Sequence, residues 1–155
     1  APKDDDAFRK NWRRPLRKDE FQGLYRLIQS AKSRGIEIAW TLSPLGARLR
    51  DPQEARTAVL KLKSVLNLGI RKLALAFDDV DPEIKQIDFA NRVFKSLLLD
   101  YPDLEMTFVP ATYWGDAVPS LYLDYLGRRL DLRFRAYPRG RELKELFPTN
   151  TSWLD

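Results

Sequence analysis

The chain has 155 residues, of which 44% are hydrophobic, and a net charge of +5, so it can form one globular unit with a substantial core. It contains no cysteine and no histidine, which excludes disulfides, thiolate nucleophiles, imidazole-dependent triads and the commonest zinc sites within this chain. Any acid–base chemistry must therefore use Asp, Glu, Lys or Tyr side chains.

The first predicted helix runs from near Asp19 to Gly35, because apolar residues recur along one helical face and glycine commonly ends a helix. These apolar residues are Phe21, Leu24, Tyr25, Ile28 and Ala31. A strand follows over residues 36–42, which are rich in β-branched and aromatic side chains, and it closes at Ser43-Pro44.

Asp51, followed by Pro52 and by Glu54 three positions after it, predicts a helix start with a capping box. That helix continues to Gly69. The remaining predicted elements are a strand over 70–77, a helix from about 82 to 100, a strand over 105–109, a helix over 120–130, a strand over 132–136 and a helix over 139–146.

Strands that alternate regularly with helices predict parallel pairing through helical crossovers. Two architectures fit this α/β pattern: a doubly wound open sheet, or an incomplete (β/α)8 TIM barrel with about four βα units. A complete barrel typically takes ~250 residues. The sequence has no glycine-rich phosphate-binding motif, which disfavours a nucleotide-binding open sheet.

Asp78 and Asp79 directly follow the apolar strand 70–77. Carboxylates are costly to desolvate, and α/β enzymes keep their chemistry at the carboxyl ends of parallel strands. One interpretation is a catalytic pair. A second is a helix cap, with Asp79 or Asp81 preceding Pro82, and a third is a divalent-metal site formed by Asp78, Asp79 and Asp81.

Two basic clusters allow a nucleic-acid-binding surface as a further interpretation. They comprise Arg9, Lys10, Arg13, Arg14, Arg17 and Lys18, and then Arg128, Arg129, Arg133, Arg135, Arg139 and Arg141. Acidic residues interrupt both clusters and no nucleic-acid motif accompanies them, which favours a solvated rim and no nucleic-acid partner.

No apolar stretch approaches the ~20 residues that span a bilayer, so we expect no membrane partner. No signal peptide is recognisable, and the cellular compartment stays open. The chain opens on Ala1 rather than Met, which predicts a piece cut from a longer polypeptide.

Four segments together resemble the O-GlcNAcase family of β-N-acetylglucosaminidases, glycoside hydrolase family 84. They are residues 1–5 (APKDD), 40–44 (WTLSP), 77–80 (FDDV) and 108–115 (FVPATYWG). The resemblance extends to about residue 131 and implies a (β/α)8 catalytic barrel. On this basis residues 1–155 are one partial barrel domain that lacks its first and last strands.

The resemblance implies retaining, substrate-assisted hydrolysis of terminal β-linked N-acetylglucosamine on a glycoprotein or glycan, with no cofactor and no metal. The 2-acetamido oxygen of the sugar attacks the anomeric carbon, Asp78 orients the acetamido N–H, and Asp79 serves as general acid and then base. Close like charges promote the opposite protonation states that these roles require.

The resemblance also assigns three substrate-binding residues. Tyr113 would hold the acetamido group, Lys3 would contact sugar hydroxyls, and Trp114 could stack on a sugar. The alternatives are a cleft-edge tyrosine whose hydroxyl simply finds a partner, and a solvated terminal lysine. Trp40 is expected in the core.

The sequence departs from the family pattern at Thr112, where the family usually has Glu. It also has residues 134–138 (FRAYP) in place of a Trp-Thr-Gly string, and it has no Trp-Asp-Asn segment. We therefore expect the isolated chain to be inactive or weakly active. A carbohydrate-binding barrel without turnover is the main alternative, and a nucleic-acid-binding α/β module is a lesser one.

Overall fold

The computed structural model describes residues 6–78, 80–111, 120–129, 134–136 and 152–153. A short 3-10 helix, Asp6–Phe8, is followed by α1 (Lys18–Ser33), β1 (Ala39–Leu42), α2 (Pro52–Leu66), β2 (Lys72–Ala76), α3 (Ile84–Leu98), β3 (Glu105–Val109), α4 (Ser120–Arg129), β4 (Phe134–Ala136) and β5 (Ser152–Trp153).

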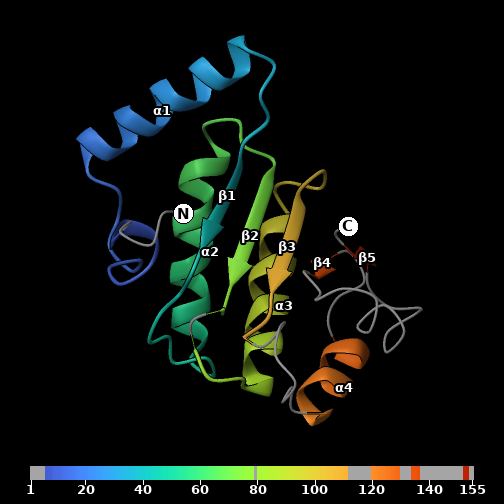
Figure 1. Cartoon of the computed structure of the whole chain (residues 1–155). Coiled ribbons are helices and arrows are strands. Elements are labelled where there is room, and N and C mark those ends of the chain that lie inside the picture. The colour runs from blue at the N-terminus through green and yellow to red at the C-terminus, as the bar shows by residue number, and fades with distance from the viewer. Residues whose placement is uncertain (1–5, 79, 112–119, 130–133, 137–151, 154–155) are drawn as a thin grey trace.

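The strands form one parallel sheet in the order β1-β2-β3-β4-β5. Leu42 pairs with Leu75, Leu75 with Phe108, and Phe108 with Ala136. The first four strands therefore end within one residue of the same level, and the loops after β1 and β2 leave the sheet along one edge. Figure 1 shows α2 and α3 side by side over one face of β1, β2 and β3.

The core lies between this sheet and the two helices. In β2, Leu73 and Leu75 are buried on the face toward the helices, and Phe77 continues the same alternation. Phe77 packs edge-on against Phe89 of α3, with ring centroids 6.2 Å apart, and lies 5.8 Å from Phe108 of β3. This aromatic cluster lies directly below the end of β2.

The first strand, β1, begins at Ala39, three residues later than expected. The residues just before it are hydrogen-bonded to the end of α1. Gly35 adopts a φ of +69°, and the Ile36 N–H donates to Ala31 O at 2.9 Å. This is the usual left-handed helix ending, in which glycine avoids the steric cost of positive φ. Ile36 therefore completes a helix rather than opening a strand.

The other helices and strands mostly match the expectations. The strand over 105–109 has the predicted bounds, and Asp51 caps α2 by accepting from the Gln53 N–H at 2.8 Å. The predicted helix over 139–146 lies outside the described residues, and β5 was not predicted. None of the helices in the described part of the chain is long and apolar enough to cross a membrane.

Candidate active site

Asp78 lies in a tight turn directly after β2. The Phe77 N–H still donates to Val109 O of β3 at 2.9 Å, and the Val80 N–H donates back to Phe77 O at 3.3 Å. Asp78 is therefore the first residue beyond the sheet ladder, where its side chain is half-buried. Asp79 lies outside the described residues.

The helix-cap interpretation is wrong for Asp81. The N-cap of α3 is Glu83, which makes no side-chain cap hydrogen bond, and the helix begins at Ile84. Asp81 instead presents its backbone carbonyl to the amide of Gln86, whose Nε2 lies 2.7 Å away. The capping role of Asp79 is not tested, because Asp79 is outside the described residues.

The proposed metal trio is tested only in part. Among the residues that the structure describes, no three acidic side chains converge so that they could hold a metal ion. The predicted trio includes Asp79, which that search does not reach.

The ends of β1 and β3 flank the turn of Asp78. Ser43, directly after β1, is buried, and its N–H donates to Phe8 O at 2.9 Å. Pro110 and Ala111 follow β3, with Pro110 buried. The predicted substrate-binding residues Tyr113 and Trp114, and the departure at Thr112, lie just beyond Ala111 and outside the described residues.

Two residues that the sequence reasoning missed link the Asp78 loop to the end of β3. Gln86 of α3 is 1% exposed and accepts, through Oε1, a hydrogen bond of 3.0 Å from the Tyr122 hydroxyl of α4. The Tyr122 oxygen in turn accepts from the Ala111 N–H at 3.2 Å. Burial raises the pKa of Tyr122, so its hydroxyl stays protonated and can donate.

A sequence signal for Gln86 did exist. Ala90, Val93 and Leu97 follow it at helical spacing and are all buried, so Gln86 is the polar member of an apolar stripe. A buried glutamine requires partners for both its donor and its acceptor, which is what the structure provides.

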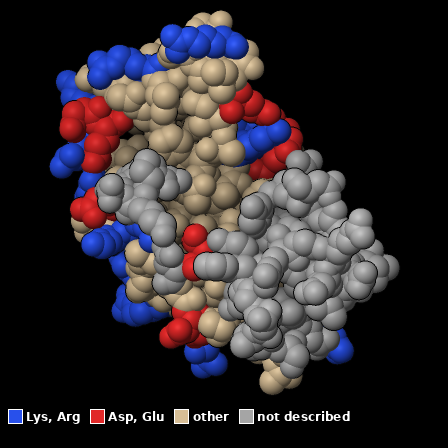
Figure 2. Space-filling model, in the orientation of Figure 1, with Lys and Arg blue, Asp and Glu red and all other residues tan. Residues whose placement is uncertain are grey.

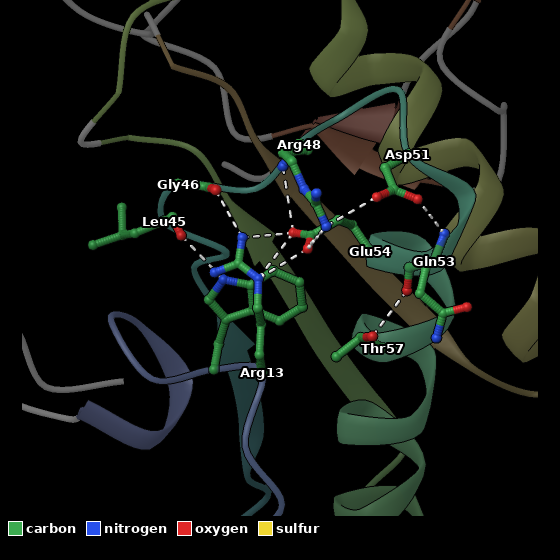
Figure 3. A network of polar contacts seen from close by, with 9 residues as sticks. Arg13, Leu45, Gly46, Arg48, Asp51, Gln53, Glu54 and Thr57 are labelled. Atoms are coloured by element: carbon green, nitrogen blue, oxygen red, sulfur yellow. Dashed lines mark hydrogen bonds and ion pairs between the residues drawn. The ribbon is translucent and has the colours of Figure 1, made fainter.

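A second network fastens the N-terminal segment to the loop after β1 (Figure 3). Glu54 of α2 is 5% exposed and receives Arg13 Nη2 at 2.6 Å and Arg13 Nε at 2.9 Å. Arg13 also donates to Gly46 O at 2.7 Å, and Trp12 Nε1 donates to Leu45 O at 3.1 Å. The segment that leads to Lys3 is thereby anchored beside the end of β1, and Lys3 itself lies outside the described residues.

Glu54 therefore does not complete the predicted capping box. Its carboxylate turns toward Arg13, and it also accepts from the Arg48 N–H at 3.3 Å. These hydrogen bonds, those from Arg13 first, hold the pKa of Glu54 below its ordinary value. The tertiary partner competes successfully because a doubly hydrogen-bonded ion pair is stronger than a bond to one backbone N–H.

Three of the basic residues near the start of the chain, Arg13, Arg14 and Arg17, form ion pairs with neighbouring acids. Arg14 binds Glu20 with an N–O distance of 2.5 Å, and Arg17 lies 3.1 Å from the same carboxylate. These bonds, led by that from Arg14, lower the pKa of Glu20 to about 2. Figure 2 shows basic side chains over α1 at the top and largely uncharged atoms through the middle of this face.

Trp40 occupies a partly buried position beside the N-terminal segment, as expected for a core residue. Its ring meets that of Phe8 edge-on, with centroids 5.0 Å apart. Within the described residues its buried Nε1 has no hydrogen-bond partner.

Comparison with known proteins gives a consistent result. Residues 1–143 match the sequence family described as beta-N-acetylglucosaminidase. The protein O-GlcNAcases of Rattus norvegicus and Mus musculus are 31% and 30% identical to this chain over 149 residues. The match covers 84% of this chain and 16% of each relative, so the chain spans about a sixth of their length.

Solved structures share the fold. An O-GlcNAc hydrolase variant from Thermobaculum terrenum superposes with a TM-score of 0.88 at 24% identity, covering all of this chain and 39% of the other. CpGH84B superposes with a TM-score of 0.84 at 20% identity, covering 99% of this chain and 32% of the other. The predicted fold class, an incomplete (β/α)8 barrel with parallel strands, is confirmed. The match over residues 1–143 confirms the resemblance seen in four segments: the chain belongs to the beta-N-acetylglucosaminidase family of glycoside hydrolases.

Proposed function

We propose that this chain carries the acid pair of a retaining β-N-acetylglucosaminidase that removes terminal β-linked N-acetylglucosamine from a glycoprotein or glycan. The observation that supports it best is the place of Asp78. It follows a buried parallel strand, at the edge of the sheet where barrel enzymes keep their chemistry, in a chain whose first 143 residues match the family.

In the proposed reaction the sugar supplies its own nucleophile. The acetamido oxygen attacks the anomeric carbon and forms an oxazoline. Asp78 accepts a hydrogen bond from the acetamido N–H and stabilises the positive charge that develops on this group. Asp79 protonates the departing oxygen and then removes a proton from the attacking water, so that the enzyme regains its initial protonation state. Most retaining glycosidases instead use one carboxylate as the nucleophile.

The proposed sugar contacts come from three further residues. Tyr113 would hold the acetamido group, Lys3 would bind hydroxyls, and Trp114 would stack on a ring. At position 112 this proposed pocket has the hydroxyl of a threonine where the family usually has the carboxylate of a glutamate. We treat residues 1–155 as one partial barrel domain and propose no metal or cofactor for the reaction.

The test is hydrolysis of an aryl N-acetyl-β-glucosaminide by the full-length polypeptide that includes these residues. Asp79→Asn should lower kcat at least about 100-fold, the range lost with a general acid, and Asp78→Asn should lower it similarly. The N-trifluoroacetyl substrate should react much more slowly with the wild type, since its carbonyl oxygen is less nucleophilic.

Asp103→Asn is the matched control, because Asp103 is an exposed aspartate at the opposite end of β3, 3.5 Å from Arg71. Its kcat should equal that of the wild type. Binding of N-acetylglucosamine without turnover by a folded wild type would replace the hydrolase proposal with a carbohydrate-binding barrel.

A further inference from the structure

The loop that carries Asp78 is fastened at both of its ends. On one side the Phe77 N–H is bound to Val109 O, and on the other the Asp81 carbonyl is bound to Gln86 Nε2. Gln86 also accepts a hydrogen bond from the Tyr122 hydroxyl, and the Tyr122 oxygen accepts one from the Ala111 N–H. The second tie therefore joins the β2–α3 loop to the end of β3 through two helices.

The three hydrogen bonds that connect Ala111, Tyr122, Gln86 and Asp81 each have only one possible direction. The Ala111 N–H can only donate, so the Tyr122 oxygen accepts from it and must give its single proton to Gln86 Oε1. The Gln86 amide nitrogen then faces the Asp81 carbonyl, which can only accept. Because Gln86 and Tyr122 are both buried, water cannot replace a lost partner without cost.

The two ends of this tie lie close in sequence to the proposed catalytic groups. Asp81 is in the same short loop as Asp78 and Asp79, and Ala111 comes two residues before Tyr113. A shift of about 1 Å between such groups can cost a large part of the rate. A fixed separation of the two backbones would therefore matter for the reaction as well as for folding.

We propose that Gln86 and Tyr122 are positioning residues, which set the loop of the acid pair against the end of β3, the segment that precedes Tyr113 in the sequence. This inference rests on the proposed hydrolase function. Neither side chain touches substrate in this proposal; both act through the backbone of Asp81 and Ala111.

Tyr122→Phe is the sharpest variant, because it removes one oxygen atom and keeps the ring. Tyr125→Phe is its matched control: Tyr125 is also on α4, and its hydroxyl binds Asp88 of α3 at 3.1 Å without reaching either strand end. Both variants therefore remove a hydrogen bond between α3 and α4, but only Tyr122→Phe breaks the connection between the Asp78 loop and the end of β3.

The readout is the ratio of kcat/KM for an aryl glycoside with a poor leaving group to kcat/KM for a dinitrophenyl glycoside, because kcat/KM reports the departure of the leaving group and not the later attack of water. The poor leaving group needs protonation, so a displaced acid should lower its kcat/KM about tenfold, with about a twofold change for the dinitrophenyl substrate. Tyr125→Phe should leave the ratio unchanged. A loss of folded enzyme would lower both rates equally and leave the ratio at its wild-type value.

Hydrogen exchange at the Ala111 amide gives a second readout that needs no activity. Exchange should be about tenfold faster in Tyr122→Phe and in Gln86→Met, since each variant breaks a hydrogen bond in the series that connects Ala111 to Asp81. It should be unchanged in Tyr125→Phe. An active wild type whose leaving-group ratio is unaltered in Tyr122→Phe would overturn the positioning role. A wild type without turnover would overturn the proposed function and, with it, this role.

Discussion

Two polar networks fasten loops at the carboxyl edge of this sheet, and they are built from different chemistry. The network around Glu54 is ionic, and its partner Arg13 remains 40% exposed at the side chain. The network around Gln86 is neutral, and its partner Tyr122 is 3% exposed. The charged pair thus occurs where one partner, Arg13, stays in contact with water. The neutral groups occur where both partners, Gln86 and Tyr122, are removed from water.

The physical reason lies in the cost of desolvation. A fully buried ion pair must recover several kcal/mol per ion from its contacts, whereas a neutral hydrogen-bonded chain needs only complete pairing. The contrast predicts that the stability supplied by the Glu54 network falls in acid. The stability supplied by the Gln86 network should instead fall when a single donor or acceptor atom is removed.

The largest effect on stability is expected from Gln86→Met. This change keeps the side-chain length and deprives the Asp81 carbonyl of its donor and the Tyr122 hydroxyl of its acceptor, so we expect unfolding free energy to fall by about 2–3 kcal/mol. Urea unfolding measures it. Gln53→Met, at an exposed glutamine of α2, should change stability by less than about 0.5 kcal/mol; equal losses would show that the Gln86 bonds contribute nothing particular.

Glu54→Gln should cost somewhat less, about 1–2 kcal/mol, because the amide oxygen still accepts hydrogen bonds while the charge and the second acceptor oxygen are lost. The control is Glu37→Gln, which alters an exposed ion pair with Lys72 at 2.8 Å and should cost no more than about 0.5 kcal/mol. If the Glu54 variant is as stable as the Glu37 variant, burial of the carboxylate does not strengthen its network.

Acid should reduce stability through Glu54 and Glu20. Both have a pKa below the ordinary 4.5, about 2 for Glu20. The folded state therefore binds fewer protons than the unfolded chain, and the stabilisation is complete above about pH 4.5 and lost as pH falls toward the folded pKa values.

Urea unfolding between about pH 6 and about pH 3 measures this dependence. The slope of stability against pH should be smaller in Glu54→Gln and in Glu20→Gln, and should equal that of the wild type in Tyr122→Phe. A flattened slope in Tyr122→Phe would contradict the division between an ionic and a neutral network.

The smallest effect is expected at Lys85, the residue next to Gln86. Lys85 lies 3.2 Å from Glu83, and both side chains are well exposed. Lys85→Met should therefore change the unfolding free energy by less than about 0.5 kcal/mol. A loss as large as that of Gln86→Met would mean that any methionine at this point of α3 is disruptive, and would remove the comparison between the two networks.

Local patterns were sufficient for much of the architecture. Asp51 before Pro52 located the start of α2, and the apolar run before Asp78 located β2, since caps and buried strands are encoded by neighbouring residues. The start of α3 was misplaced because Asp81-Pro82 imitates a helix start. In the structure the side-chain amide of Gln86 donates to the Asp81 carbonyl, and the helix begins only at Ile84.

The sequence by itself determined the alternation of helix and strand, the parallel sheet and the position of Asp78 at a strand end, because each depends on short-range periodicity. Only the tertiary structure decided the partners of Glu54, Gln86 and Tyr122. Arg13 is 41 residues from Glu54, and Tyr122 is 36 from Gln86. Buried polar groups must be paired wherever the fold brings donor and acceptor together, and no spacing rule specifies a partner at such separations.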